Sequence, residues 1–283
     1  MIKLAIAPVL DGMHYANLGD IHFILANYYL KYPRYRDYFL ENKGKKFTIV
    51  DNGAYEFGTP LDMKTLCHIY EEAGCDELIL PDVEYDWEQT KKLSWEALSW
   101  LQDNYDEYNN DGDIMLDGPN LQYVLQGSDY SSMITNCSGF VHEREITSFR
   151  YWNIQKFGVP LYKKNWQDRI YAVKQLALGT TRKFHLLGLH DPLELAVYKE
   201  KDNVFSADGG FAVKFGCYNM KWSLEGEFVV NRDKYPNDIE KLEVTIDSDK
   251  SIKHNADIAK KLAKRHDNII NQLSKPELNE YRD

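Results

Sequence analysis

Polar side chains follow four apolar runs of the chain, at the point where each run ends. They are Asp51 after 47–50, Asp82 after 77–80, Gln126 after 121–125 and Asp208 after 203–206. In parallel sheets, whether open or closed into a barrel, ligands bind at the carboxyl ends of the strands. Three acids converging on one pocket would be electrostatically costly without a purpose, so this pattern predicts a catalytic or binding site.

Asp208 is the candidate around which we arrange the others. It ends the apolar run Val204–Ala207 and precedes the glycines Gly209 and Gly210. Glycine leaves the backbone free enough for a ligand to come close, and barrel enzymes present reactive groups at strand ends in this way. We therefore expect Asp208 to be the reactive carboxylate.

Several of these residues also have an ordinary structural interpretation. Asp51 to Gly53 has the composition of a turn with an Asx hydrogen bond. Asp82 is placed to cap the helix expected near Trp87, and Asp191 to cap the one that follows it. His185 lies inside an expected strand and is interpreted as a packed residue. The coincidence of strand-end positions favours a site over these separate explanations.

A metal centre is a weaker hypothesis. Three carboxylates can hold Mg²⁺, but a transition-metal barrel hydrolase normally adds several histidines at strand ends, and only His142 and His190 are available there. The cysteines lie far apart, without a Cys-x-x-Cys pair or a histidine at ligand spacing. They are Cys67, Cys75, Cys137 and Cys217. We expect buried free thiols, no zinc site and no cofactor.

Length and composition point to a soluble globular protein. The 283 residues suit one large domain, since α/β barrels commonly run to roughly 250 residues. No apolar run approaches the ~20 residues that span a bilayer, and the N-terminus lacks a signal-peptide cleavage site. We expect a cytoplasmic protein without a membrane partner. The net charge of -10 argues against indiscriminate nucleic-acid binding but leaves room for a local basic patch.

Apolar runs alternate with stretches of helical periodicity, which is typical of repeated βα units. The expected strands are 2–7, 47–50, 77–80, 121–125, 139–142, 184–188 and 203–206. The expected helices are Ile21–Leu30, Leu61–Ala73, Trp87–Leu101, Trp166–Leu178 and Pro192–Tyr198. This alternation predicts an α/β fold with a mostly parallel sheet covered by helices, either open or closed into a barrel.

Two regions depart from the alternation. The acidic stretch 103–118 is expected to be a solvated loop. Near the C-terminus, Lys253–Leu273 is expected to be a charged helix with an apolar stripe at Ile258, Leu262, Ile269 and Leu273. We therefore expect a barrel domain over 1–250, and a C-terminal helix and tail over 251–283 that pack on it.

The order and spacing of the motifs resemble the tRNA-guanine transglycosylase superfamily, especially the compact phage-type and bacterial branch that places 7-deazaguanines in DNA. The motifs are Asp51-Asn52-Gly53-Ala54-Tyr55-Glu56, Asp82, Gln126-Gly127, His185-Leu186-Leu187-Gly188-Leu189 and Asp208. The resemblance implies a (β/α)₈ TIM-type barrel with a C-terminal helical extension. It also implies a transferase that exchanges guanine in DNA for a free 7-deazaguanine base such as preQ0, in the host cytoplasm if a phage encodes it, so protecting phage DNA from host nucleases.

The resemblance also implies roles for individual residues. Asp208 aligns with the nucleophile that attacks C1′ of the sugar and forms a covalent intermediate, and Asp51 would shuttle the proton on the base. The expected base-binding residues are Asp82, Gln126, Gly127, Gly188, Tyr55 and Asn52. The chemistry agrees, because a carboxylate accepts from guanine N1–H and the exocyclic amine while an amide donates to O6. Two displacements at one carbon preserve its configuration.

Departures from the family pattern favour DNA over tRNA. Asn52, Ala54 and Tyr55 replace a serine, the second glycine and a phenylalanine of the family motif, and Glu84 stands where the tRNA enzymes often have a cysteine. The tRNA enzymes carry a C-terminal zinc site of three cysteines and one histidine. No cysteine follows Cys217 in this chain, so that site is absent from the sequence.

A basic segment provides an independent indication of nucleic acid. Between Arg144 and Lys183 nine Lys or Arg residues stand against two acids, a balance of +7, and aromatic residues are interleaved with them. The expected nucleic-acid contacts are Arg144, Arg150, Lys156, Lys163, Lys164 and Arg169. The alternative is a helix with an exposed basic face and buried aromatics. A guanine in a duplex cannot reach a barrel-end pocket, so we expect a flipped or single-stranded base.

Three other functions remain open at this point. The chain could be a tRNA-guanine transglycosylase, a nucleoside or nucleotide hydrolase in which water replaces the incoming base, or a non-catalytic nucleic-acid-binding barrel. Its oligomeric state is not predicted.

Overall fold

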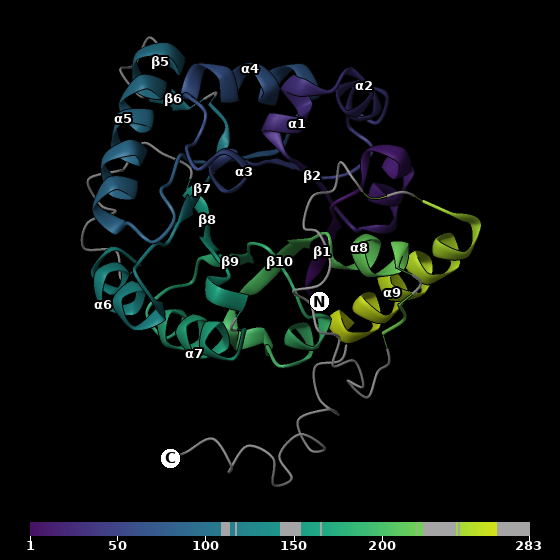
Figure 1. Ribbon diagram of the computed structural model, residues 1–283. Helices are drawn as coiled ribbons and strands as arrows, with labels where there is room; N and C mark the ends of the chain where they lie inside the picture. The colour runs from purple at the N-terminus through teal and green to yellow at the C-terminus, as the bar shows by residue number, and fades with distance from the viewer. Residues whose placement is uncertain are drawn as a thin grey trace, which may run out of the picture.

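The computed structural model describes residues 1–108, 114–116, 118–141, 154–164, 166–218, 220–222, 242 and 244–264, with the backbone alone for 105–108, 114–116, 139–141 and 164. Eight parallel strands form a nearly closed barrel surrounded by helices (Figure 1). The α/β barrel predicted from the sequence is therefore confirmed, and its architecture is that of a TIM-like (β/α)₈ barrel with a C-terminal helix.

Neighbouring strands of the barrel pair in parallel throughout. In spatial order they are β1 (Lys3–Ile6), β10 (Val204–Gly209), β9 (Lys183–Leu186), β8 (Ile154–Val159), β7 (Asn120–Val124), β4 (Glu77–Ile79), β3 (Thr48–Val50) and β2 (His22–Ile24). Between β1 and β2 the barrel is closed by a single parallel bridge from Ala5 to Ile21. Beside that bridge, the Leu4 carbonyl accepts hydrogen bonds from the backbone N–H groups of Asp20 and Ile21 at 2.6 and 3.3 Å.

The strands are buried on both faces, which explains their continuous apolar runs. One apolar cluster fills the barrel interior and consists of Ala5, Ile21, Phe23, Ile49, Ile79 and Val124. Residues that alternate with these along the strands, such as Leu4, Val50 and Leu78, belong to the larger cluster shared with the surrounding helices. Side chains of the interior layer therefore determine what can reach the carboxyl ends of the strands.

Helices cover the outside of the barrel (Figure 1). The α-helices are α1 (Ala26–Lys31), α2 (Pro33–Glu41), α3 (Ala54–Phe57), α4 (Met63–Ala73), α5 (Trp87–Tyr105), α6 (Tyr130–Val141), α7 (Trp166–Ala177), α8 (Phe211–Cys217) and α9 (Ile246–Lys264). Short 3₁₀ helices are η1 (Leu10–Leu18), η3 (Tyr162–Lys164), η4 (Pro192–Ala196) and η5 (Glu200–Asp202). The carboxylate of Asp191 accepts from the N–H of Leu193 at 2.9 Å, so the predicted N-cap of η4 is confirmed.

One strand and one helix predicted from the sequence are wrong. The run 139–142 is not a strand, because helix α6 continues to Val141, and the strand that follows it is β8. The stretch Ile21–Leu30 is not one helix, because β2 occupies His22–Ile24 and only α1 is helical. Short apolar runs suit either structure, and pairing with β3 and β7 decided the outcome. The expected loop 103–118 also contains an antiparallel pair, β5 (Asp106–Tyr108) with β6 (Ile114–Leu116).

The C-terminal helix α9 packs against α8 and η4 on the outside of the barrel. Ile258 and Leu262 are buried as the apolar stripe predicted, whereas Ile269 and Leu273 lie outside the described residues. The helix begins earlier than expected because Thr245 and Ser248 exchange two hydrogen bonds that cap its N-terminus, at 2.7 and 3.2 Å. A domain boundary at 250 would therefore divide α9. Among the helices in the described part of the chain, none has both the length and the hydropathy to cross a membrane.

Candidate functional site

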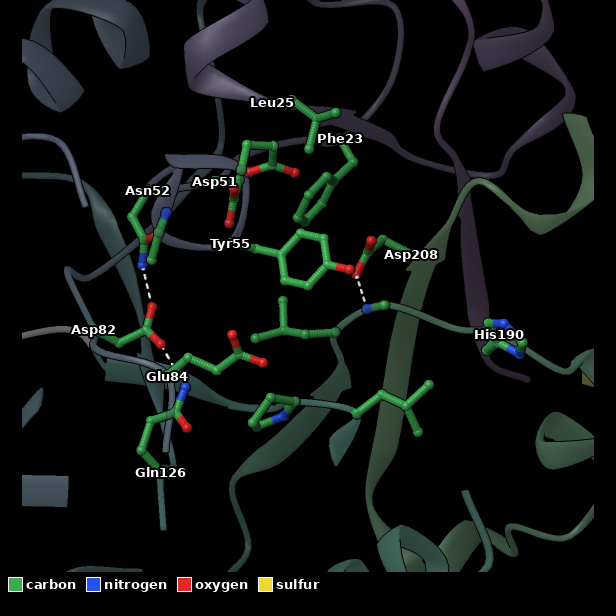
Figure 2. Close-up of a pocket in the computed structure, with 16 residues that line it drawn as sticks. Phe23, Leu25, Asp51, Asn52, Tyr55, Asp82, Glu84, Gln126, His190 and Asp208 are labelled. Atoms are coloured by element: carbon green, nitrogen blue, oxygen red, sulfur yellow. Dashed lines mark hydrogen bonds between the residues drawn. The ribbon is translucent and has the colours of Figure 1, made fainter. Parts of the chain in front are cut away.

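A pocket of about 220 Å³ opens at the carboxyl ends of the barrel strands (Figure 2). Its lining residues are Phe23, Leu25, Asp51, Asn52, Ala54, Tyr55, Glu56, Asp82, Glu84, Gln126, Pro160, Leu161, Leu187, Gly188, His190 and Asp208. The structure thus brings together the four strand-end residues Asp51, Asp82, Gln126 and Asp208. Pockets for drug-sized ligands measure about 300–1,000 Å³, so this one suits a smaller molecule such as a single ring system.

Asp208 is held at the end of β10 through one of its two carboxylate oxygens. Its Oδ1 accepts hydrogen bonds from the backbone N–H of Gly188 at 3.0 Å and from Nε2 of His185 at 3.2 Å. Gly188 has a positive φ of 69°, a backbone conformation that glycine adopts without strain, and this turn aims its N–H at the carboxylate. In the described part of the chain, Oδ2 of Asp208 has no hydrogen-bond partner. Asp208 is only 8% exposed, so this oxygen is available chiefly to a molecule inside the pocket.

His185 lies below Asp208 inside the barrel and is fixed on two sides. Its Nδ1 is 2.7 Å from the hydroxyl oxygen of Ser206, and its ring stacks on Phe23 with the two planes only 1° apart. The sequence predicted a packed residue rather than a ligand. The side chain is indeed fully buried, but it also positions Asp208, a role that the sequence analysis missed.

Asp82 is clamped between two amide side chains. Its Oδ1 accepts from Nδ2 of Asn52 and its Oδ2 accepts from Nε2 of Gln126, both at 2.6 Å (Figure 2). Burial raises the pKa of Asp82 to about 6, although the two amide hydrogen bonds act in the opposite direction. Asp82 caps no helix, because the N-terminal turn of α5 is capped by Asp86, whose carboxylate accepts from the N–H of Gln89 at 3.0 Å.

Gln126 is oriented by hydrogen bonds to its carbonyl oxygen. Oε1 accepts from the hydroxyl of Tyr162 at 2.8 Å and from the N–H of Tyr85 at 3.1 Å. Nε2 therefore points to Asp82 and keeps a second N–H for a ligand. The neighbouring Gly127 does not line the pocket; its N–H donates to Tyr162, and a Cβ there would lie 2.4 Å from the backbone nitrogen of Met133. The prediction that Gly127 binds the base is wrong, because this residue packs closely against helix α6 instead.

Asp51 and Glu56 form a pair of acids at the end of β3 and on α3. Asp51 accepts from the N–H of Gly53 at 3.0 Å, so the predicted Asx turn is present as well. Burial, followed by the charge of Glu56, raises the pKa of Asp51 well above its usual range. Burial raises the pKa of Glu56 to about 7, and the charge of Asp208 adds to this. The surroundings of both acids therefore favour their protonated forms.

Glu56 had no predicted role. It stands in the motif that begins at Asp51, and its acidic side chain there was the signal that could have identified it.

Tyr55 projects at the mouth of the pocket and is 74% exposed. Figure 2 shows its ring across the centre of the view, between Asp51 and Asp208, while His190 lies apart from the carboxyl groups. Apolar walls come from Phe23, Leu25, Pro160, Leu161 and Leu187. None of these five was among the predicted site residues. Phe23 and Leu25 lie in a stretch that was interpreted as a helix, and β8, which precedes Pro160 and Leu161, was not identified. Leu187 was named only as part of a motif.

Two predicted nucleic-acid contacts are wrong. Lys156 is 4% exposed and forms an ion pair with Glu77 inside the barrel. Arg169 is fully buried and forms an ion pair with Glu194, and its guanidinium also donates to the carbonyl of Leu187 at 2.6 Å. Buried cations that already have carboxylate partners cannot contact a phosphate backbone.

The remaining basic residues divide into two groups. Lys163 is exposed on η3, next to the pocket residue Leu161 and the buried Tyr162. Arg144, Arg150 and the side chain of Lys164 lie outside the described residues, so their predicted contacts stay predictions.

None of the four cysteines lines the pocket. All four cysteines are free, and Cys67, Cys75 and Cys137 are buried as expected, whereas Cys217 is partly exposed. Within the described ranges, no group of three or more His, Cys, Asp or Glu side chains has the arrangement of a metal site.

Comparison of the chain with models of known protein families finds no match, and comparison with curated proteins finds no significant relative. The resemblance to the transglycosylase superfamily therefore stays a prediction. The function has to be inferred from the geometry of the pocket.

Proposed function

We propose that the protein breaks and re-forms the bond between a sugar and a purine base, exchanging guanine in DNA for a free 7-deazaguanine. One observation carries this proposal. A single small pocket holds Asp208, whose Oδ2 has no partner in the described structure, together with Asp82, which two amide groups hold in place. A nucleophile for the sugar and an acceptor for the base are the two groups that such a reaction requires.

Asp208 acts as the nucleophile in the proposed reaction. Because Gly188 and His185 hold Oδ1, the other oxygen attacks C1′ of the deoxyribose while the bond from C1′ to the base breaks. An ester between Asp208 and the sugar results. The incoming base then attacks the same carbon from the side that the guanine left, the ester bond breaks, and the configuration at C1′ is retained.

Asp82 and Gln126 recognise the edge of the base. Each oxygen of Asp82 takes one amide hydrogen bond and retains acceptor capacity for guanine N1–H and its exocyclic amine. The second N–H of the Gln126 amide is available for O6. Apolar side chains such as Phe23 and Leu187 line the pocket beside the base, and the exposed ring of Tyr55 covers its mouth.

Asp51 supplies acid and base catalysis. A guanine leaving as an anion is a poor leaving group, so a proton must reach it as the bond to C1′ breaks. Burial and the charge of Glu56 raise the pKa of Asp51 well above its usual range, which favours a proton on this wall of the pocket. Separation of roles between a proton-bearing acid and an attacking carboxylate is the pattern by which two acids share one catalytic site.

DNA is the proposed polymer because residues 218–283 contain no cysteine, whereas the tRNA enzymes that the sequence resembles carry a zinc site of three cysteines and one histidine in their C-terminal part. The pocket lies at a barrel end, where a base stacked in a duplex cannot enter. The substrate is therefore a flipped or single-stranded guanine.

Exchange of labelled base tests the proposal. A single-stranded oligodeoxynucleotide with one guanine, and in parallel a tRNA, is incubated with the protein and radiolabelled 7-deazaguanine. We expect label to enter the DNA, Asp208→Asn to abolish its entry, and Asp103→Asn to leave it unchanged, since Asp103 is exposed on α5. Label in tRNA alone would reverse the choice of polymer. Abasic sites without label would indicate a hydrolase, and binding without turnover would indicate a non-catalytic protein.

A further inference from the structure

Glu56 is a buried acid in the pocket that the proposed reaction does not yet use. It lies on the short helix α3, three residues after Gly53, and its side chain lines the pocket. Its Oε2 is buried and has no hydrogen-bond partner in the described structure. A buried polar oxygen without a hydrogen bond is destabilising, so this position is explained best by a partner that arrives with the substrate.

Glu56 interacts electrostatically with both the nucleophile Asp208 and Asp51. The charge of Asp208 acts on Glu56, and the charge of Glu56 acts on Asp51. Like charges repel strongly in a pocket that excludes water, so ionisation of all three carboxyl groups is unfavourable and the three together favour retaining a proton. Asp51 is anchored by the N–H of Gly53 through Oδ2, whereas Oε2 of Glu56 is unpartnered. Oδ1 of Asp51 likewise has no hydrogen-bond partner in the described structure, so what distinguishes Glu56 is that its unpaired oxygen is buried.

We propose that Glu56 shares the acid–base role given above to Asp51: Glu56 delivers the proton to the departing base and recovers it from the incoming one, and Asp51 is its partner carboxyl. This assignment rests on the proposed base exchange. Asp82 is less suited to the task because both of its oxygens are engaged by amides.

The proton balance of the step is simple. As Oδ2 of Asp208 forms its bond to C1′, the bond from C1′ to N9 of guanine breaks and its electron pair stays on the purine. The proton on Oε2 of Glu56 moves to a ring nitrogen of that purine, so the base leaves neutral and Glu56 becomes a carboxylate. The incoming base then gives its N–H proton to Glu56 while its nitrogen displaces the ester oxygen of Asp208. Each turnover returns both acids to their starting state.

The environment of Glu56 suits a group that both donates and accepts. Burial raises its pKa to about 7, and proton transfer is most effective when the pKa of the catalytic group lies near the working pH. An exposed glutamate would be ionised there and would have no proton to donate. Gly53 precedes helix α3 as its N-cap residue, with a φ of 79° that glycine adopts without strain, and Glu56 on this helix lines the pocket.

A substrate whose base can leave without being protonated distinguishes a proton-donating role of Glu56 from a structural or binding role. N7-methylguanine in an oligodeoxynucleotide already carries a positive charge on its ring, so it departs as a neutral molecule without an acid. We therefore compare guanine exchange with N7-methylguanine release for four proteins: the wild type, Glu56→Gln, Asp208→Asn and Glu88→Gln. Glu88 is exposed on α5 and serves as the matched control. Circular dichroism and thermal unfolding establish that each variant is folded.

Glu56→Gln is expected to lose guanine exchange by about 10²–10⁴-fold while it releases N7-methylguanine within a few-fold of the wild-type rate. Asp208→Asn should lose both reactions, and Glu56→Asp should recover part of the exchange. Guanine exchange at the wild-type rate by Glu56→Gln would overturn the role of Glu56 and leave the proposed function intact. Equal loss of both reactions would also overturn it, by indicating a structural or binding role. A wild-type protein inactive on both substrates would overturn the proposed function and this assignment together.

Discussion

Nε2 of His185 lies 3.2 Å from Oδ1 of Asp208, and the opposite nitrogen of the same ring lies 2.7 Å from the hydroxyl of Ser206. The three residues form a line from the interior of the barrel to the pocket. Stacking on Phe23 fixes the plane of the imidazole, so the hydrogen bond can hold the carboxylate in one orientation. Asp208 is thus positioned by residues that a substrate does not touch.

Replacement of His185 tests this positioning. In His185→Phe the carboxylate retains only the N–H of Gly188, and we expect kcat of base exchange to fall by about 10²-fold, because small misplacements of a reacting group cost that much. KM should change little, since His185 does not line the pocket. His185→Gln restores a donor and should recover part of kcat. Steady-state kinetics of the wild type and the two variants measures the separate effects on kcat and KM. An unchanged kcat in His185→Phe would contradict the proposal that His185 positions Asp208.

Stability should fall as the pH rises through the pKa values of the pocket acids. Asp82 titrates at about 6 in the folded protein against an ordinary value of 3.8, and Glu56 at about 7 against 4.5. Because both folded values are raised, the folded state binds more protons than the unfolded state between about pH 4 and 7. The stabilisation is fully present at pH values below the ordinary pKa values of the two acids, and it is lost at pH values above their raised pKa values in the folded protein. Urea unfolding across this range measures the slope.

Glu56→Gln provides the control for that slope. The amide does not titrate and also removes the charge that raises the pKa of Asp51. The variant should therefore lose the part of the pH dependence that lies nearest pH 7 while keeping the part due to Asp82. A slope identical to that of the wild type would show that Glu56 is ionised in the folded protein. Carboxylate infrared bands near pH 6.5 would then distinguish the two states directly.

The ion pair of Arg169 with Glu194 is predicted to be structural. Removal of one partner from a fully buried pair leaves an uncompensated charge, so Arg169→Met should lower the free energy of unfolding by about 3–5 kcal/mol. The exposed pair of Arg34 with Asp11 is a matched control, and Arg34→Met should cost less than about 1 kcal/mol. Denaturant melts measure both. A stable Arg169→Met that lost only nucleic-acid affinity would restore the contact predicted from the sequence.

Gly53 is predicted to be irreplaceable at the start of α3. Its φ is 79°, and a Cβ there would lie 2.4 Å from Nδ2 of Asn27, whose amide donates to the Gly53 carbonyl. Gly44 has a similar φ of 73° but no atom within 4 Å of a Cβ. Gly44→Ala should therefore cost only the conformational term of about 1–2 kcal/mol. Gly53→Ala should cost more and should also displace Asp51 and Glu56, so thermal unfolding and base exchange both report it. Equal losses in the two variants would contradict the steric contribution.

Much of the candidate site was accessible from the sequence. Asp51, Asp82, Gln126 and Asp208 each end a strongly apolar run, and the end of such a run is a local property of the chain. Once the strands are parallel, their carboxyl ends must meet at one rim. The strand-end position alone was therefore enough to predict that these side chains converge.

The tertiary structure decided what local pattern could not. The sequence places Lys156 and Lys163 in one basic segment, yet β8 directs Lys156 into the barrel toward Glu77 and leaves Lys163 exposed. The partner of Lys156 comes from β4, far away along the chain, so only strand pairing could reveal it. The same holds for His185, whose contact with Asp208 depends on the register of β9 against β10. The chemistry of strand ends was determined by neighbouring residues, whereas burial and pairing of charges were determined by which strands lie side by side.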